Sequence, residues 1–126
     1  MRLLLDTHVL VWAALAPSRL SLRARDLIVD PENDRMVSAA SAYEIEYKRQ
    51  RDPDLSRLPT DLDELRGALV FEWLPVDEGH ATQAGRLPRH HRDPWDRIIV
   101  AQALAENLTV ISADKAFLIY GAKLEW

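Results

Sequence analysis

The most constraining stretch of this sequence is the uninterrupted apolar run Leu3–Leu5, which is followed directly by the carboxylate of Asp6. A strand made only of apolar residues is typical of a parallel sheet with helices on both faces. A second short run, Leu108–Ser112, lies near the C-terminus and is followed by Asp114. Because the crevice of an open α/β sheet lies at the carboxyl ends of its strands, we expect the two acids to share one site.

Length and composition set the class of protein. A chain of 126 residues corresponds to one domain, residues 1–126, and its 48% hydrophobic and 29% charged residues are ordinary for a soluble globular protein. The absence of cysteine excludes disulfides and thiolate metal sites, and it favours a reducing compartment. A net charge of −4 argues against a protein that coats nucleic acid with its whole surface, although a local basic patch is compatible with it.

The N-terminal region loosely imitates a signal peptide, with Arg2 ahead of the leucines and the apolar stretch Val9–Ala16. Asp6 and His8 interrupt the apolar run, however, and nothing in the sequence approaches the roughly 18 apolar residues of a membrane span. The sequence therefore predicts a cytoplasmic protein that does not enter a membrane.

Strands and helices are predicted to alternate along the chain. The expected strands are residues 2–6, 36–38, 70–74 and 108–111, with a further edge strand at 123–126. The expected helices are residues 8–15, 23–29, 39–51, 60–69, 77–87, 94–106 and 115–120. Such alternation indicates βαβ units with right-handed crossovers. The predicted fold is a single three-layer α/β/α domain with a central parallel sheet of four or five strands.

Four acids stand out by their positions at strand ends or on helices that face the sheet: Asp6, Glu44, Asp96 and Asp114. Each also has a purely structural interpretation. Asp6 and Asp114 are suitable helix caps. Glu44 fits a capping box with Ser41, or an ion pair with Lys48 one turn further along the helix.

Convergence of the four acids would favour a metal site. Asp96 shares a helix face with Ile99 and Val100, so it heads the stripe expected to pack on the sheet. Each pair of carboxylates at ~4 Å costs about 4 kcal/mol of repulsion at an effective dielectric of 20. A divalent cation offsets this repulsion, and carboxylates without soft ligands favour Mg²⁺ or Mn²⁺. Water bound to such an ion is the obvious nucleophile for a phosphoryl group.

Asp93 lies three residues before Asp96 and directly before Pro94. A residue before proline is pushed out of the helical region, which suits an N-cap, and Pro94 fits the first helical position. Asp93 is therefore expected to accept from the backbone N–H of Trp95 or Asp96. Either acid remains a candidate ligand at this point, and Asp93 is alternatively a residue that holds a water beside the ion.

Four motifs carry a resemblance to a known family: Leu4–Leu10, Ser41–Ile45, Leu87–Arg97 and Ile111–Asp114. In this order and spacing they resemble the PIN domain and, more narrowly, the VapC-type ribonuclease toxins of bacterial toxin–antitoxin pairs. The resemblance covers essentially the whole chain. It implies Mg²⁺- or Mn²⁺-dependent endonucleolytic cleavage of RNA, homodimerisation, and inhibition by a small co-expressed antitoxin. The family's acidic quartet corresponds to Asp6, Glu44, Asp96 and Asp114, and its small hydroxyl residues beside the acids correspond to Thr7 and Ser112.

Cations close to the acids are the candidates for substrate contact: Lys48, Arg86, Arg89, Arg92 and Arg97. Runs of charge are usually a solvated surface, but one run here adjoins the predicted metal site, which favours phosphate contact. A ribonuclease using His90 and His91 as acid and base fits less well. Adjacent residues point in different directions, and the four acids would then have no role.

Two rival functions belong to other classes. A phosphoacceptor signalling domain has the same length and fold type, but it needs paired acids after the first strand and a separate lysine, whereas here Asp6 is alone and Lys115 directly follows Asp114. A non-catalytic PIN scaffold that only binds RNA or a partner is disfavoured by four intact acids. The four tryptophans are too scattered along the chain to predict an aromatic platform, and Trp73 and Trp95 are expected mainly to pack.

Overall fold

The computed structural model describes residues 1–90 and 93–126, and its centre is a sheet of five strands in the order β3-β2-β1-β4-β5. Every neighbouring pair of strands is parallel. The strands are β1 Arg2–Leu5, β2 Asp34–Ser38, β3 Glu72–Leu74, β4 Thr109–Ile111 and β5 Lys123–Glu125. The predicted parallel sheet is confirmed, including the edge strand at the C-terminus.

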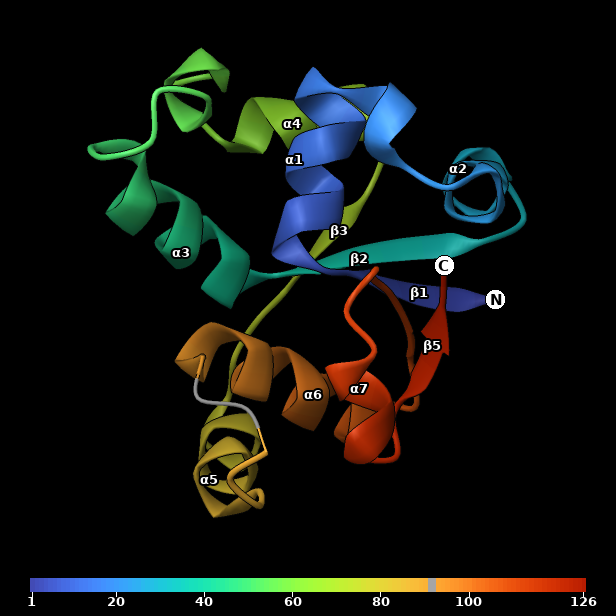
Figure 1. Ribbon diagram of the computed structural model, residues 1–126, viewed down its shortest axis with the longest axis vertical. Coiled ribbons are helices and arrows are strands. Elements are labelled where there is room, and N and C mark those ends of the chain that lie inside the picture. The colour runs from blue at the N-terminus through green and yellow to red at the C-terminus, as the bar shows by residue number, and fades with distance from the viewer. Residues whose placement is uncertain (91–92) are drawn as a thin grey trace.

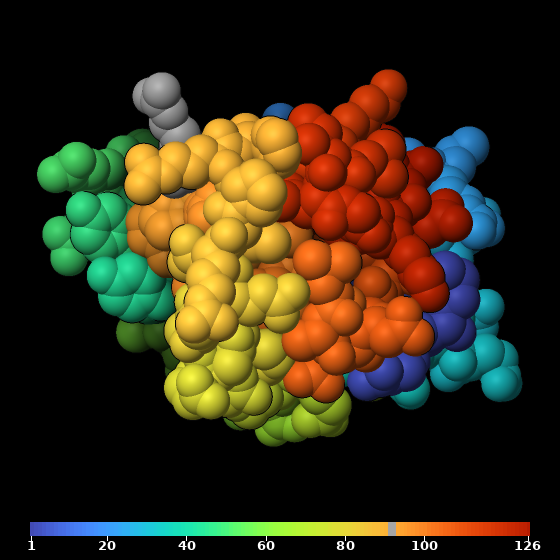
Figure 2. Space-filling model, turned by 90° about the horizontal axis from the view of Figure 1, so that it is seen from below, coloured from blue at the N-terminus to red at the C-terminus, as the bar shows by residue number. Residues whose placement is uncertain are grey.

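Helices cover both faces of the sheet, as Figure 1 shows. Their bounds are α1 Thr7–Leu15, η1 Pro17–Arg19, α2 Leu22–Val29, α3 Ala39–Arg49, η2 Leu55–Arg57, α4 Asp63–Leu69, α5 Glu78–Arg86, α6 Pro94–Glu106 and α7 Ala116–Ile119. One buried cluster joins the sheet to α1, α2 and α4, and the other joins it to α6 and α7. Helix α5 packs on the outside of α6, and Figure 2 shows this face of the molecule. The architecture is the predicted three-layer α/β/α domain.

The first strand is the centre of both packing layers. Leu3 and Leu5 belong to the cluster under α1, whereas Leu4 belongs to the cluster under α6, and all three are at most 1% exposed. Burial of one such side chain contributes about 1.5–3 kcal/mol. The apolar run therefore places Asp6 at the centre of the sheet's carboxyl edge.

Serine residues cap the starts of α2 and α3. Ser21 caps α2, since its Oγ accepts from Ala24 N at 3.0 Å. The capping box that the sequence offered as one role for Ser41 and Glu44 is absent, because Ser38 caps α3 instead, with its Oγ accepting from Ala40 N at 3.1 Å. Helix α3 thus begins before Ser41, and that hydroxyl is available for another contact.

The strand predicted at 70–74 is shorter, because Val70 takes up a left-handed conformation (φ 54°) as the C-cap of α4 and β3 begins only at Glu72. Among residues 1–90 and 93–126, the helices are all too short or too polar to cross a membrane.

The strand register pairs Leu5 with both Val37 and Ile111. The residues that follow these three strands, together with the start of α6, form the candidate site.

Candidate active site

Asp6 follows β1 and is 5% exposed. Its Oδ2 accepts from Ser112 Oγ at 2.7 Å, and its backbone N–H donates to Ile111 O at 3.1 Å. Asp6 occupies the N-cap position of α1, but its side chain makes no cap hydrogen bond. The capping role that the sequence offered as an alternative for Asp6 is therefore absent. Burial raises the pKa of Asp6 and outweighs the opposing effect of the Ser112 hydrogen bond.

Ser112 links the first and last acids of the sequence. Besides donating to Asp6, the Ser112 hydroxyl accepts from the backbone N–H of Asp114 at 3.0 Å. Asp114 Oδ1 in turn accepts from Ala116 N at 2.9 Å, although the N-cap position of α7 is occupied by Lys115 rather than by Asp114. One oxygen of Asp114 therefore stabilises the turn into α7 while the residue lines the same cleft as Asp6.

Glu44 reaches the site from α3, and a buried hydroxyl pair fixes that helix against α1. Thr7 Oγ1 and Ser41 Oγ are 2.8 Å apart, and both residues are buried. The Glu44 side chain is only 4% exposed, and its Oε2 accepts from Lys48 Nζ at 2.6 Å. The ion pair that the sequence offered as an alternative role for Glu44 is present, and it is largely buried on the carboxylate side.

Asp93 and Asp96 have the distinct positions expected from Pro94. Asp93 Oδ1 accepts from the backbone N–H of Trp95 at 2.9 Å and of Asp96 at 3.2 Å, so Asp93 caps α6. Asp96 lies in the first turn. Burial, followed by the charges of Asp6, Asp93, Glu44 and Asp114, raises the pKa of Asp96 to about 8. Asp96 is therefore close enough to all four of these acids to be affected by their charges.

Two carboxylate oxygens in this cluster lack compensation. Asp6 Oδ1 and Glu44 Oε1 are buried and have no hydrogen-bond partner within residues 1–90 and 93–126. A buried, unpaired carboxylate oxygen is costly. Hard oxygen donors of this kind are what Mg²⁺ and Mn²⁺ prefer, so the residues present fit a divalent cation.

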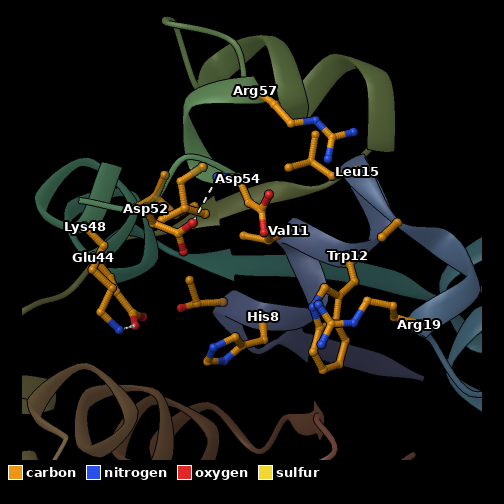
Figure 3. Close-up of a pocket in the computed structure, with 14 residues that line it drawn as sticks. His8, Val11, Trp12, Leu15, Arg19, Glu44, Lys48, Asp52, Asp54 and Arg57 are labelled. Carbon is orange, nitrogen blue, oxygen red and sulfur yellow. Dashed lines mark hydrogen bonds and ion pairs between the residues drawn. The ribbon is translucent and has the colours of Figure 1, made fainter. Parts of the chain in front are cut away.

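The acids line two adjoining hollows. The first is a cleft of about 300 Å³ whose lining includes Asp6, Asp96 and Asp114. The second, shown in Figure 3, is a groove of about 170 Å³ along α1 whose lining includes Glu44 and Lys48. His8 and Trp12 line both hollows, so they separate the cleft from the groove.

The predicted cationic contacts divide into three groups. Lys48 lies at the acids, and Arg86 and Arg89 are exposed at the end of α5 and in the following loop. Arg92 and His91 lie outside the described residues. Arg97 instead donates to backbone carbonyls, among them Ala84 O at 2.7 Å and Leu87 O at 2.8 Å. These bonds give Arg97 a structural role in holding the loop after α5, so we do not retain it as a substrate contact.

Sequence reasoning missed an aromatic cluster beside the acids. Tyr43 and Tyr47 lie one turn apart on α3, with ring centroids 6.1 Å apart, and Trp95 lies 5.9 and 5.7 Å from them. The two tyrosines are 62% and 60% exposed. The i, i+4 spacing of the tyrosines was visible in the sequence, whereas their contact with Trp95 depends on the packing of α3 near α6.

A second group of possible metal ligands, Asp77, His80 and Glu106, was also missed, and its ligand atoms lie within 4.8 Å of one another. His80 Nδ1 accepts from Asp77 N at 3.2 Å, so the imidazole carries its proton on Nε2, which lies 2.9 Å from Glu106 Oε1. The ring therefore connects the start of α5 to the end of α6. Both of its nitrogens are engaged, which points to a structural role.

The parallel sheet, the helices on both faces and the acids at the carboxyl edge define an α/β/α domain with an acidic site, and comparison with known proteins identifies the family. The PIN domain model matches residues 3–123, and the chain belongs to the PIN domain family. A search of the curated proteins finds no match.

Solved structures share this fold. A DNA-bound VapBC complex from Salmonella typhimurium is 18% identical, with a TM-score of 0.71 over 99% of this chain and 97% of that chain. VapBC2 from Rickettsia felis, bound to a promoter DNA fragment, is 18% identical, with a TM-score of 0.68 over 100% and 99%. FitAcB from Neisseria gonorrhoeae is 20% identical, with a TM-score of 0.64 over 97% and 95%. At these identities the likeness establishes the fold.

Proposed function

We propose that this protein is an Mg²⁺- or Mn²⁺-dependent endoribonuclease that acts in the cytoplasm as the toxin of a toxin–antitoxin pair. The observation that carries the proposal is the buried acidic cluster of a PIN-family chain, in which Asp6 Oδ1 and Glu44 Oε1 have no partner in the described part of the chain. A site with such oxygens, and with the pKa of Asp96 raised to about 8, is organised for a cation.

Asp6, Asp96 and Asp114 line the cleft and are the candidate ligands of the ion, while Glu44, the fourth acid of the predicted quartet, lies in the adjoining groove. A divalent cation held there would lower the pKa of a bound water and stabilise charge on a phosphoryl oxygen. Ser112 orients Asp6 and the backbone of Asp114, and the Thr7–Ser41 pair fixes the helix that carries Glu44. Asp93 holds the first turn of α6 and so sets the position of Asp96. These four residues, Ser112, Thr7, Ser41 and Asp93, support the acids without serving as ligands.

RNA is the proposed substrate, and its phosphates would contact cations around the cleft. Lys48 lies at the acids, and Arg86 and Arg89 are exposed on the loop side of α5. Arg92, which directly precedes Asp93 in the sequence, is proposed as a further phosphate contact. A net charge of −4 restricts this binding to the local patch.

The direct test is cleavage of RNA by the purified chain with Mg²⁺ or Mn²⁺, with and without a chelator. We expect cleavage that stops on chelation and in Asp6→Asn, while His90→Ala retains it. Chelator-insensitive cleavage that disappears in His91→Ala would contradict the metal mechanism and favour the acid–base alternative. Metal binding without any cleavage of RNA would favour the non-catalytic scaffold.

The groove along α1 is the proposed site of the antitoxin. Its lining combines apolar residues such as Val11 and Leu55 with the carboxylates of Asp52 and Asp54, and it opens on Glu44. A partner segment with an apolar face, followed by an arginine or lysine that reaches the acids, would complement it. A small protein encoded beside this one should then bind the chain and prevent Mn²⁺ binding. A complex that still binds Mn²⁺ at full affinity would contradict this form of inhibition.

A homodimer is the proposed assembly, and the aromatic cluster of Tyr43, Tyr47 and Trp95 marks a suitable face. The hollow around this cluster is lined by apolar residues and tyrosines, with no charged residue among the described ones. Depletion of charge and enrichment of aromatic residues are typical of interface cores. Light scattering should give a dimer for the wild type and for Leu118→Glu on exposed α7, and a monomer for Tyr43→Glu.

A further inference from the structure

The acidic site contains a cation supplied by the chain itself. The Lys48 ammonium lies 2.6 Å from Glu44 Oε2 and 5.2 Å from the centre of the Trp95 ring. Figure 3 shows the two side chains of the pair ending together at the edge of the groove. The Lys48 side chain is 41% exposed, whereas that of Glu44 is 4% exposed. The lysine stem therefore runs from the surface and brings its charge to a buried carboxylate.

This pair differs from an ordinary i, i+4 ion pair on a helix surface. In surface pairs both groups stay in water and the interaction is weak. Here Glu44 is buried, and Lys48 also interacts with Asp93 and Asp96, which belong to the start of α6. Although burial opposes it, the hydrogen bond and charge of Glu44, and then the charges of both aspartates, raise the pKa of Lys48. The ammonium is thus a fixed positive charge among acids from two separate elements.

The acids do not all line one hollow. Asp6, Asp96 and Asp114 line the cleft, whereas Glu44 lines the adjoining groove together with Lys48. A second divalent ion on Glu44 would meet the ammonium that already binds it.

We propose that the site takes one divalent ion, in the cleft of Asp6, Asp96 and Asp114, and that Lys48 supplies the second positive charge for the scissile phosphate. This inference rests on the proposed function. An ammonium has three N–H donors, and Glu44 Oε2 accepts one of them, so donors remain for a phosphate oxygen. Glu44 is then a positioning residue for Lys48, and Glu44 does not bind the ion.

The test counts bound Mn²⁺ per chain by electron paramagnetic resonance, in the absence of RNA. The wild type should bind one ion, and Lys48→Met should bind two, because removal of the ammonium makes Glu44 available as a ligand. Lys123→Met is the matched control. Lys123 lies at the opposite end of the sheet, where its Nζ donates to Asn107 Oδ1, and this variant should bind one ion.

A second variant keeps the proposal falsifiable if Lys48→Met does not fold. Glu44→Gln should still bind one ion with unchanged affinity, because Glu44 is not a ligand of the ion in the cleft. Two ions on the wild type, one ion on folded Lys48→Met, or loss of the ion from Glu44→Gln would each overturn the proposal and leave a metal-dependent nuclease standing. A wild-type chain that binds no Mn²⁺ would overturn the proposed function as well.

Discussion

Two groups of acids lie at opposite ends of α6, and they differ in how completely their charges are compensated. Asp96 is in the first turn of the helix, and Glu106 is its last residue, so about 15 Å separates them along the axis. At the far end, His80 binds Glu106 and closes a capping box with Asp77. At the sheet end, Asp6 and Glu44 each keep a buried oxygen without a partner among the described residues.

This difference shows why the density of acids alone is a poor guide to a functional site. The Asp77–His80–Glu106 group meets a distance criterion for metal ligands, yet its imidazole already has a partner on each nitrogen. The acids at the sheet edge are more spread out, but burial and like charge raise the pKa of Asp96 to about 8. Uncompensated charge in a cleft is the stronger sign of a cation-binding site.

The largest expected effect is a difference in RNA cleavage between variants at the two ends of α6. Asp96→Asn should lower Mg²⁺-dependent RNA cleavage by about 100-fold or more, since loss of a ligand should cost at least as much as loss of a group that orients one. Glu106→Gln should leave cleavage within the error of the assay. The measurement is the initial rate on a fluorescent RNA, and equal losses in the two variants would erase the distinction.

The next effect is the dependence of the free energy of unfolding on pH in the metal-free protein. The pKa of Asp96 is about 8 in the folded chain, against about 3.9 for an ordinary aspartate, so between these values the folded state holds a proton that the unfolded state does not. The free energy of unfolding should therefore fall as the pH rises from about 5 to about 8. Asp96→Asn should flatten this decline, and millimolar Mg²⁺ should raise the melting temperature of the wild type at pH 8.

If the free energy of unfolding falls equally steeply with pH in the wild type and in Asp96→Asn, the Asp96 carboxyl is not the group that causes the pH dependence. The matched control is Asp77→Asn at the other end of α6, which should retain the wild-type dependence on pH.

Local sequence signals predicted much of this structure. The unbroken apolar run of β1 predicted a strand buried on both faces, and Asp93 before Pro94 predicted the cap of α6, because both signals depend on neighbouring residues only. The capping box offered as one role for Ser41 is absent, because the start of α3 is set by Ser38, at the end of β2.

The rest depends on contacts between distant segments. The bonds from Arg97 to the carbonyls of Ala84 and Leu87 follow from the packing of α5 on α6, and no local pattern reveals them. The cluster of Tyr43, Tyr47 and Trp95 likewise forms only when α3 and α6 meet. The proximity of Lys48 to Asp93 and Asp96 likewise depends on the packing of α3 near α6, whereas its i, i+4 pairing with Glu44 was predictable from the sequence.

A smaller effect is expected at the compensated end of α6. His80→Ala removes a ring that is 3% exposed and accepts or donates two hydrogen bonds, so it should lower the free energy of unfolding by about 1–3 kcal/mol. Denaturant titration measures the change. Cleavage of RNA by the folded fraction should be unaltered, and a specific loss of activity without loss of stability would give His80 a functional role.

The smallest effect is expected at the cap of α6. Asp93→Asn should change stability by only a few tenths of a kcal/mol, because asparagine caps about as well as aspartate. Its cleavage rate should stay close to that of the wild type, since Asp93 Oδ1 already accepts two backbone N–H groups. An inactive Asp93→Asn beside an active Asp96→Asn would mean that cap and ligand are exchanged.

The position of the ion is the central claim, and one titration tests it most directly. Mn²⁺ binding followed by electron paramagnetic resonance can be compared in the wild type, Asp96→Asn and Glu106→Gln under identical conditions. We predict that Glu106→Gln binds Mn²⁺ as the wild type does and that Asp96→Asn binds it at least about tenfold more weakly. Wild-type affinity in Asp96→Asn together with loss of binding in Glu106→Gln would contradict the claim and place the ion between α5 and α6.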